Sequence, residues 1–208
     1  MYEIREGINK VLSSAKAKFN ESIDVVFALD RKVVKQSVRG VIDLPHLVSS
    51  DVEVGAFVKS DLVDECKKAG AKFVGDEDLI QSILDGARVQ CDWFVTTPDF
   101  MPKVAKLSKI LGPKGLMPNP KFGTVTTSVV ETIEKLKSGR IKFKSDSYAL
   151  VHIKVGDVKF TVDALEENIV ECANAVKGLS AVDGKPLVIQ AMHLSSTMGE
   201  GSVKLKVC

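Results

Sequence analysis

The sequence predicts a mixed α/β fold made of two domains, the first of which is discontinuous. Strand patterns predominate at both ends of the chain, whereas strands and helices alternate in the middle. The chain has 208 residues, 45% of them apolar, which is enough for two small domains with sizeable cores. The economical arrangement is an α+β terminal domain of residues 1–47 and 140–208, with a three-layer α/β domain of residues 48–139 inserted in it.

The N-terminal part of the chain is predicted to form a helix followed by two strands. The helix covers Ile4–Ala17. The segment Ser22–Asp30 alternates apolar and other residues, as a strand with one buried face does. A second strand is expected over Val38–Leu44, and it ends at Pro45.

The middle of the chain has the pattern of a small Rossmann-like unit with a parallel sheet. Its predicted strands are Val52–Val58 and Asp92–Thr96, and its predicted helices are 61–69, Asp76–Asp85, 98–111 and Ser128–Ser138. Gly70, Gly86 and Gly139 end three of these helices. Thr97 precedes Pro98, which is typical of an N-cap followed by Pro at the first helical position.

The last part of the chain is predicted to return to strands around one long helix. The strands are Arg140–Lys144, Tyr148–Val155, Val158–Val162 and Leu187–Leu194, with Ser202–Val207 pairing back onto the last of them. Asp163 and Glu166 have the spacing of a capping box. They would begin a helix whose buried side contains Leu165, Ile169 and Cys172.

Composition argues against a membrane, a metal and a disulfide framework. No apolar run approaches the ~18 residues that a transmembrane helix needs. The four Cys have no CxxC spacing and the three His are scattered. We therefore expect a cytoplasmic protein with neither a metal nor a cofactor.

The most informative segment is Leu111–Val125, which contains three Pro, three Gly and two Lys but no acid. Pro and Gly fix the backbone in special conformations, and apolar residues among them argue against a loose linker. From Met101 to Lys121 there are five Lys and no acidic residue, a pattern that favours contact with phosphate. These lysines are Lys103, Lys106, Lys109, Lys114 and Lys121. An ordinary solvated helix face is the alternative.

Further short motifs occur in order along nearly the whole chain. They are Ala17-Lys-Phe19, Ser37-Val-Arg-Gly40, Leu44-Pro-His46, Ala69-Gly-Ala71, Val74-Gly75, Thr97-Pro-Asp99, Ser138-Gly-Arg-Ile141 and Ser195-Ser-Thr-Met-Gly199. In these motifs and in Leu111–Val125 the chain resembles the large-subunit ribosomal stalk proteins, the L-one family.

The resemblance implies what the protein binds. It implies a terminal domain that grips the mobile side stalk of large-subunit ribosomal RNA, and an inserted domain that faces exit-site tRNA and assists its release. Bacterial members often also bind the mRNA of their own operon and repress its translation. We expect a non-enzymatic, ribosome-associated protein that is a monomer when free. Typical members begin about one basic helix before the position of Met1, so we expect a smaller phosphate contribution here.

The resemblance also assigns residues. The expected RNA contacts are Lys18, Phe19, Glu21, Arg39, Asp146, Ser195, Ser196, Thr197, Met198 and Gly199, and the five lysines above are expected to face tRNA. Phe19 can stack on a base, and Glu21 can accept a hydrogen bond from a 2′-hydroxyl. The residues alone also allow a buried Phe19, and an ordinary turn in which Met198 fills the core.

Two other classes of function remain as alternatives. A nucleotide-using enzyme is disfavoured, because Gly112–Gly115 is followed by Leu-Met rather than by the Lys-Ser/Thr of a phosphate loop. Pro113 and Pro118 also lack the amide donors that a phosphate cradle uses. The other alternative is an RNA- or DNA-binding regulator without a ribosomal role. Sedimentation with or without large subunits separates it from a stalk protein.

Overall fold

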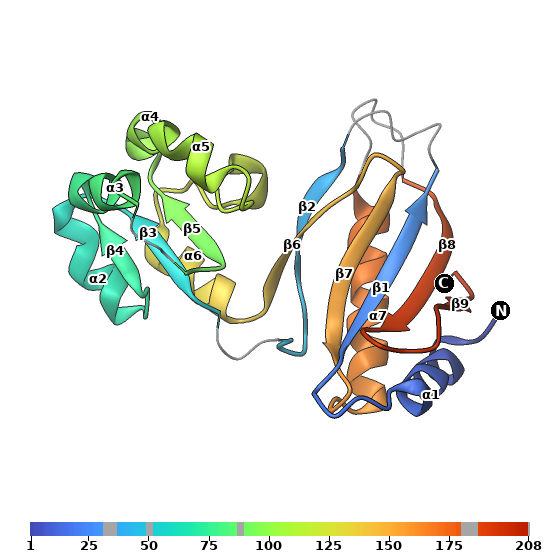
Figure 1. The fold of residues 1–208 in the computed structure, drawn as a ribbon. Coiled ribbons are helices and arrows are strands. Elements are labelled where there is room, and N and C mark those ends of the chain that lie inside the picture. The colour runs from blue at the N-terminus through green and yellow to red at the C-terminus, as the bar shows by residue number, and fades with distance from the viewer. Residues whose placement is uncertain (31–36, 49–51, 87–89, 180–186, 208) are drawn as a thin grey trace. The chain divides into compact units, whose positions relative to one another are not determined.

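The protein divides into two compact units, of which the first is built from both ends of the chain (Figure 1). Residues Met1–Val48 and Ile141–Cys208 form unit 1, and Ser49–Arg140 form unit 2. The computed structural model describes residues 1–30, 37–48, 52–86, 90–179 and 187–207. Within those ranges no helix has both the length and the apolarity that a membrane span requires.

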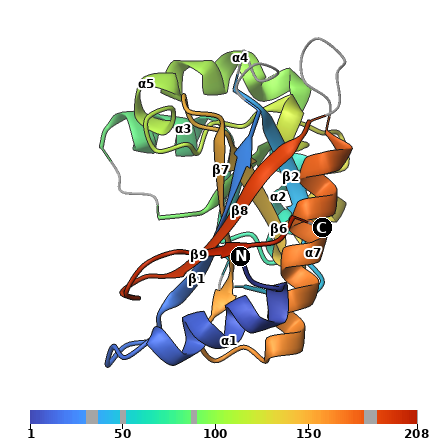
Figure 2. The same ribbon diagram turned by 90° about the vertical axis from the view of Figure 1, so that its right-hand side faces the viewer.

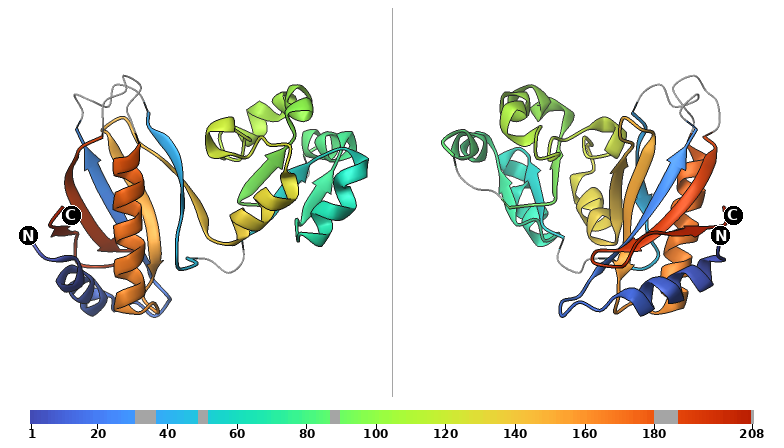
Figure 3. Two further views of the ribbon diagram at one scale, coloured as in Figure 1. Left: turned by 180° about the vertical axis from the view of Figure 1, so that it is seen from behind. Right: turned by 45° about the vertical axis from the view of Figure 1, so that its right-hand side comes forward.

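Unit 1 is a four-stranded antiparallel sheet with two helices on one face (Figures 2 and 3). The strand order is β7-β1-β8-β9, with β1 Ser22–Leu29, β7 Leu150–Asp157, β8 Ile189–Ser196 and β9 Val203–Leu205. The covering helices are α1 Ile4–Ser14 and α7 Val162–Gly178. The expectation that the C-terminal segment pairs back onto the preceding strand is confirmed by the β8–β9 pairing.

The core of unit 1 follows from the alternation in β1. Ile23, Val25, Phe27 and Leu29 are buried against the helices, as predicted. The alternate residues of β1 lie on the other face of the sheet, which the two helices leave uncovered. Helices on one side bury only one face of a strand, so the core of unit 1 lies between the sheet and α1 and α7.

A second, two-stranded sheet in unit 1 pairs β2 Arg39–Asp43 with β6 Arg140–Lys144. A Cβ at Gly40 would lie 2.8 Å from the Phe143 ring, so only glycine allows this close packing. The buried Asn168 of α7 holds the chain shortly after the end of β2. Its Oδ1 accepts the His46 N–H at 3.1 Å, and its Nδ2 donates to the Val155 carbonyl at 2.8 Å.

Unit 2 contains a three-stranded parallel sheet, which confirms the prediction of a parallel α/β unit. The order is β4-β3-β5, with β3 Val54–Phe57, β4 Phe73–Gly75 and β5 Trp93–Thr96. Helices α2 Val63–Lys68 and α6 Val129–Lys137 contact each other, α3 Glu77–Leu84 packs on β4, and a short helix η1 Ser60–Leu62 precedes α2. Phe57 stacks on Phe94 with ring centroids 4.7 Å apart.

The helix predicted over 98–111 is wrong as a single helix. It is broken into η2 Pro98–Phe100, α4 Met101–Val104, η3 Ala105–Leu107 and α5 Ser108–Leu111. Pro102 lacks an N–H and clashes with a preceding turn, so a continuous helix across it is unfavourable. Thr97 precedes η2 but makes no capping bond, and its buried Oγ1 has no hydrogen-bond partner among the described residues.

Two predictions at the start of α7 are also wrong. Val158–Val162 is not a strand, because residues after Asp157 form a turn and Thr161 is the N-cap, its Oγ1 accepting the Ala164 N–H at 3.3 Å. Asp163 and Glu166 form no capping box. Both carboxylates instead pair with Arg5 of α1, Glu166 at 2.9 Å. A capping box does exist in α1, between Glu3 and Glu6, and α1 ends at Ser14 rather than at Ala17.

Candidate RNA-binding surface

The last residues of β8 and the turn after it, residues 195–199, are called here the β8 corner. Three hydrogen bonds attach it to the first residue of β1. The Thr197 N–H donates to the Ser22 carbonyl at 3.1 Å, and Thr197 Oγ1 accepts the Ser22 N–H at 3.1 Å. Thr197 Oγ1 also lies 3.3 Å from the Ser22 carbonyl, to which it donates. The Thr197 side chain is therefore used to hold the corner in place.

Glu21 joins the β8 corner to the turn that precedes β1. Its side chain is only 1% exposed. One carboxylate oxygen accepts the Met198 N–H at 3.0 Å and the other accepts the Ala17 N–H at 3.1 Å. The bond from Met198, followed by that from Ala17, lowers the pKa of Glu21, whereas burial opposes this shift. The expectation that Glu21 reaches out to RNA needs correction, because its carboxylate is occupied inside the protein and positions the corner.

The Gly199 backbone packs so closely on Ser196 that a Cβ at position 199 would overlap the Ser196 hydroxyl. A Cβ on Gly199 would lie 2.5 Å from Ser196 Oγ and 3.2 Å from Ser14 Oγ. Ser196 Oγ is buried and makes no hydrogen bond of ordinary geometry with a described residue. The Ser196 hydroxyl is also close to the Glu21 carboxylate. It lowers the pKa of Glu21, but less than the Met198 and Ala17 N–H groups do. A side chain at position 199 would therefore force Ser196 Oγ to move.

Two large apolar side chains, Phe19 and Met198, are exposed near these hydrogen bonds. Phe19 is 55% exposed and Met198 is 66% exposed. Lys18 and Thr197 are exposed beside them, and Ser195 is half-buried. A buried Phe19 and a core-filling Met198 are therefore both excluded. Exposed apolar side chains held by a rigid, hydrogen-bonded backbone are typical of a binding surface.

Two of the predicted RNA contacts lie elsewhere in unit 1. Asp146 builds the turn before β7, where its Oδ1 accepts the N–H groups of Tyr148 and Leu150, each at 2.8 Å. Leu150 pairs with Ala28, which is about 20 Å along β1 from Ser22. Arg39 is exposed on β2, outside the four-stranded sheet. The structure therefore brings together residues 18–21 and 195–199, but not Asp146 or Arg39.

The lysines of unit 2 are not equivalent. Lys103 Nζ lies 2.5 Å from Glu77 Oε1 of α3 and 4.7 Å from the centroid of the Phe100 ring. Glu77 raises the pKa of Lys103, and Lys103 lowers the pKa of Glu77. The sequence-based argument that no acid lies near these lysines is thus wrong for Lys103. The other four, Lys106, Lys109, Lys114 and Lys121, are exposed.

The Pro- and Gly-rich segment after α5 is held by its own hydrogen bonds. The Asn119 N–H donates to Thr124 Oγ1 at 2.8 Å, and Asn119 Oδ1 accepts the Lys121 N–H at 2.9 Å. A short helix, η4 Pro120–Phe122, follows and ends at Gly123, whose φ is +67°. These bonds and the fixed φ of each Pro present Lys121 on an ordered loop.

The side chains that could bind a metal or act as a nucleophile are dispersed over the part of the chain that the structure describes. Among the residues that the structure describes, no group of three or more His, Cys, Asp or Glu could hold a metal ion. Burial in α7 raises the pKa of Cys172 to about 12, so that thiol is unreactive at neutral pH. His152 is exposed on the uncovered face of the sheet and lies 4.0 Å from Asp146.

Comparison with known proteins gives the relationship of the chain. A model of the family described as "Ribosomal protein L1p/L10e family" matches residues 11–200. The chain belongs to this family. The relatives include proteins named large ribosomal subunit protein uL1 from Anaplasma marginale, 46% identical over 200 residues, covering 95% of this chain and 92% of the relative. That from Wolbachia pipientis is 40% identical, with 94% and 91% covered, and that from Coxiella burnetii is 41% identical, with 96% and 87% covered.

Membership of the L1p/L10e family supports two of the sequence-based expectations. The family is one of ribosomal proteins, in agreement with the expectation that the chain is not an enzyme. The mixed α/β fold is also as expected. Sequence reasoning missed Ser14, the last residue of α1, whose Oγ lies 3.2 Å from the position that a Gly199 Cβ would occupy. No local sequence pattern indicated it, because only the folded chain brings Ser14 close to Gly199.

Proposed function

We propose that the protein is a structural constituent of the large ribosomal subunit in the cytoplasm, and that it binds the mobile side stalk of large-subunit ribosomal RNA through unit 1. The observation that supports this most directly is that Phe19 and Met198 are exposed close to one buried carboxylate, that of Glu21, which accepts the backbone N–H groups of Ala17 and Met198. The family and the names of its relatives support the ribosomal location.

The proposed mechanism is recognition of RNA shape without chemistry. Phe19 offers an aromatic face to a base, and the neighbouring Lys18 offers a positive charge to phosphate. Met198 offers an adaptable apolar contact. Gly199 allows a ribose to approach the backbone closely. The Glu21 and Thr197 hydrogen bonds keep these groups in place before RNA arrives, so less conformational entropy is lost on binding.

We propose a second contact, between unit 2 and exit-site tRNA. The supporting observation is that four lysines are exposed, Lys106 on η3, Lys109 on α5, and Lys114 and Lys121 in the segment that follows α5. Contacts of this kind are made chiefly to phosphate, so they depend on salt and little on base sequence. Assistance of tRNA release would follow from a weak contact of this type.

We further propose that the β8 corner binds the mRNA of the protein's own operon when ribosomal RNA is saturated. The physical basis is that a surface reading backbone shape and 2′-hydroxyls accepts another RNA of the same local shape. The same substitutions at the corner should then weaken both interactions.

The test of the main proposal is a titration of the full chain with a stalk RNA fragment and with plain duplex RNA of equal length, at several salt concentrations. Preference for the stalk fragment should persist as salt rises, because phosphate contacts are common to both RNAs. Equal affinity for the two RNAs at every salt concentration would contradict it. In lysates, sedimentation with large subunits is expected, whereas a free regulator would remain at the top of the gradient.

A further inference from the structure

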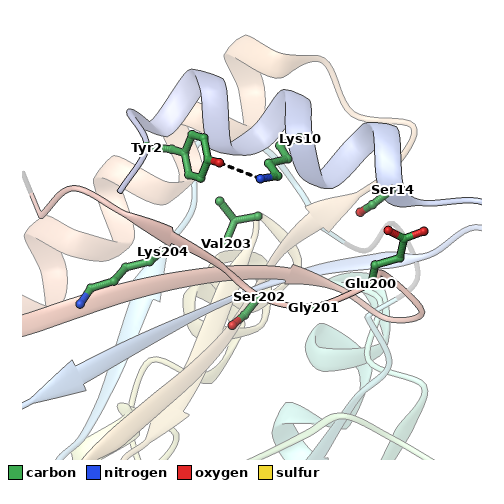
Figure 4. A pocket seen from close by; sticks show the side chains of 8 residues that line it. All are labelled: Tyr2, Lys10, Ser14, Glu200, Gly201, Ser202, Val203 and Lys204. Atoms are coloured by element: carbon green, nitrogen blue, oxygen red, sulfur yellow. Dashed lines mark hydrogen bonds between the residues drawn. The ribbon is translucent and has the colours of Figure 1, made fainter.

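A cavity of about 320 Å³ lies beside the β8 corner, between α1 and the segment that leads from the corner to β9 (Figure 4). Six of the residues that line it are polar, namely Tyr2, Lys10, Ser14, Glu200, Ser202 and Lys204, but the side chains of Ser202 and Lys204 point away from Tyr2 and Lys10 (Figure 4). None of them is among the residues predicted from the sequence to bind RNA. Cavities of this size are at the lower end of those that hold small ligands, about 300–1,000 Å³.

The wall of the cavity formed by Tyr2 is fixed by the backbone. The Tyr2 N–H donates to the Lys204 carbonyl at 3.0 Å, and the Tyr2 carbonyl accepts the Lys206 N–H at 2.9 Å. Tyr2 therefore continues the sheet beyond β9. Two turns into α1, Lys10 reaches back and donates from Nζ to the Tyr2 hydroxyl at 2.7 Å (Figure 4). The amine also lies 4.5 Å from the centroid of the Tyr2 ring.

Hydrogen-bond donors predominate in the cavity. A lysine ammonium has three N–H donors, and Lys10 gives one of them to Tyr2 among the described residues. The Tyr2 hydroxyl, having accepted from Lys10, keeps its own proton to donate. The acidic Glu200 is paired with Lys16 at 3.3 Å, which offsets its charge at the rim. This arrangement suits an anionic oxygen with hydroxyl groups next to it.

The cavity and the β8 corner share a wall. Glu200 directly follows Gly199, and Ser14 Oγ is 3.2 Å from the position that a Gly199 Cβ would occupy. Ser14 lines the cavity from the opposite side. A polymer that contacts Met198 and Gly199 therefore meets the cavity next along its path.

We propose that this cavity binds one ribose-phosphate unit of the RNA strand that contacts the β8 corner, with the phosphodiester oxygens at Lys10 Nζ and the Tyr2 hydroxyl. The inference rests on the proposed RNA binding by unit 1. It adds a subsite formed by the N-terminal helix and the β9 edge, and it extends the contact beyond the corner by one nucleotide.

The test compares variants of the full chain in binding to a stalk RNA fragment. Lys10→Gln removes the charge but keeps a similar side-chain length, and it should weaken binding about tenfold or more. It should also reduce the slope of log affinity against log salt by about 0.7–0.9, the value for one phosphate contact. Tyr2→Phe keeps the ring and removes the hydroxyl, and it should weaken binding about threefold to tenfold. Lys67→Gln, on α2 of unit 2, removes the same charge from an exposed site and should change neither quantity.

Neutral methylphosphonate groups placed one at a time along the RNA give an independent readout. At one position, the wild-type protein and Lys10→Gln should bind with equal affinity, because the partner charge is gone. The proposal is overturned if no position abolishes the difference, or if Lys10→Gln and Tyr2→Phe bind as the wild type does. In the latter case a weakened Met198→Ala shows that the corner still binds RNA, whereas an unchanged Met198→Ala overturns the proposed function as well. Thermal unfolding of each variant excludes loss of the fold as the cause.

Discussion

Substitution of Gly199 by Ala tests the idea that the shape of the β8 corner determines RNA affinity. The new Cβ would lie 2.5 Å from Ser196 Oγ, whereas ordinary contacts are 3.4–4 Å. Overpacking of this kind costs about 1–3 kcal/mol, and the restricted unfolded chain returns about 0.4–1 kcal/mol. We therefore expect a net destabilisation of about 1–2 kcal/mol, or a fall of roughly 2–8 °C in the melting temperature of a chain of this length. RNA affinity should fall with it, because Met198 and its neighbours move.

The structure supplies a rescue and a control for this substitution. Ser196→Ala removes the oxygen that the new Cβ at position 199 would strike and leaves the Ser196 Cβ at 3.7 Å, an ordinary contact. The double variant should recover most of the stability and most of the RNA affinity. Gly178→Ala is the matched control, since a Cβ there meets nothing within 4 Å, and it should be neutral or slightly stabilising. A Gly199→Ala protein with wild-type melting temperature and affinity, or a double variant without recovery, would refute the reasoning.

Three other predictions concern the two surfaces and the buried carboxylate. Met198→Ala should weaken stalk RNA binding by about 1–3 kcal/mol without lowering the melting temperature, because the side chain is exposed; an unchanged dissociation constant removes it from the site. Lys106→Glu combined with Lys109→Glu should leave stalk binding nearly intact and weaken tRNA binding in a salt-dependent way, and equal loss of both would contradict the separation of the surfaces. The lowered pKa of Glu21 means that its contribution to stability is complete above its ordinary value of about 4.5 and is lost as pH falls through the folded value. The Met198 amide resonance should therefore titrate with a midpoint below pH 4.5, and a midpoint at or above it would show that the carboxylate does not hold the corner.

The fold was predictable where one-dimensional patterns reflect burial directly. The alternation of Ile23, Val25, Phe27 and Leu29 indicated one buried face of β1, and the structure agrees. The sequence was misleading at the start of α7, where both Thr161 and Asp163 are residue types that can cap a helix. Thr161 caps α7 two residues before the expected position, so Asp163 is free to pair with Arg5, a residue 158 positions away in the chain. No local rule contains that partner.

The candidate site was predictable in its residue types but not in their roles. Phe19 and Met198 are exposed as the resemblance implied. Glu21 is buried, and a charged residue is rarely buried unless its hydrogen bonds are satisfied. Its partners are backbone N–H groups of Ala17 and Met198, which only the folded chain brings together. The ion pair that engages Lys103 likewise depends on the packing of α3 against α4.

The most direct test of the account is the response of the methionine methyl groups to RNA. Met198 is exposed at the β8 corner and Met192 is fully buried in the core of the same unit, so the two provide a probe and an internal control. With selectively labelled protein and saturating stalk RNA, the Met198 methyl resonance should shift and show contacts to ribose or base protons, while Met192 stays nearly unchanged. Saturable RNA binding that leaves the Met198 methyl resonance where it was would contradict the account.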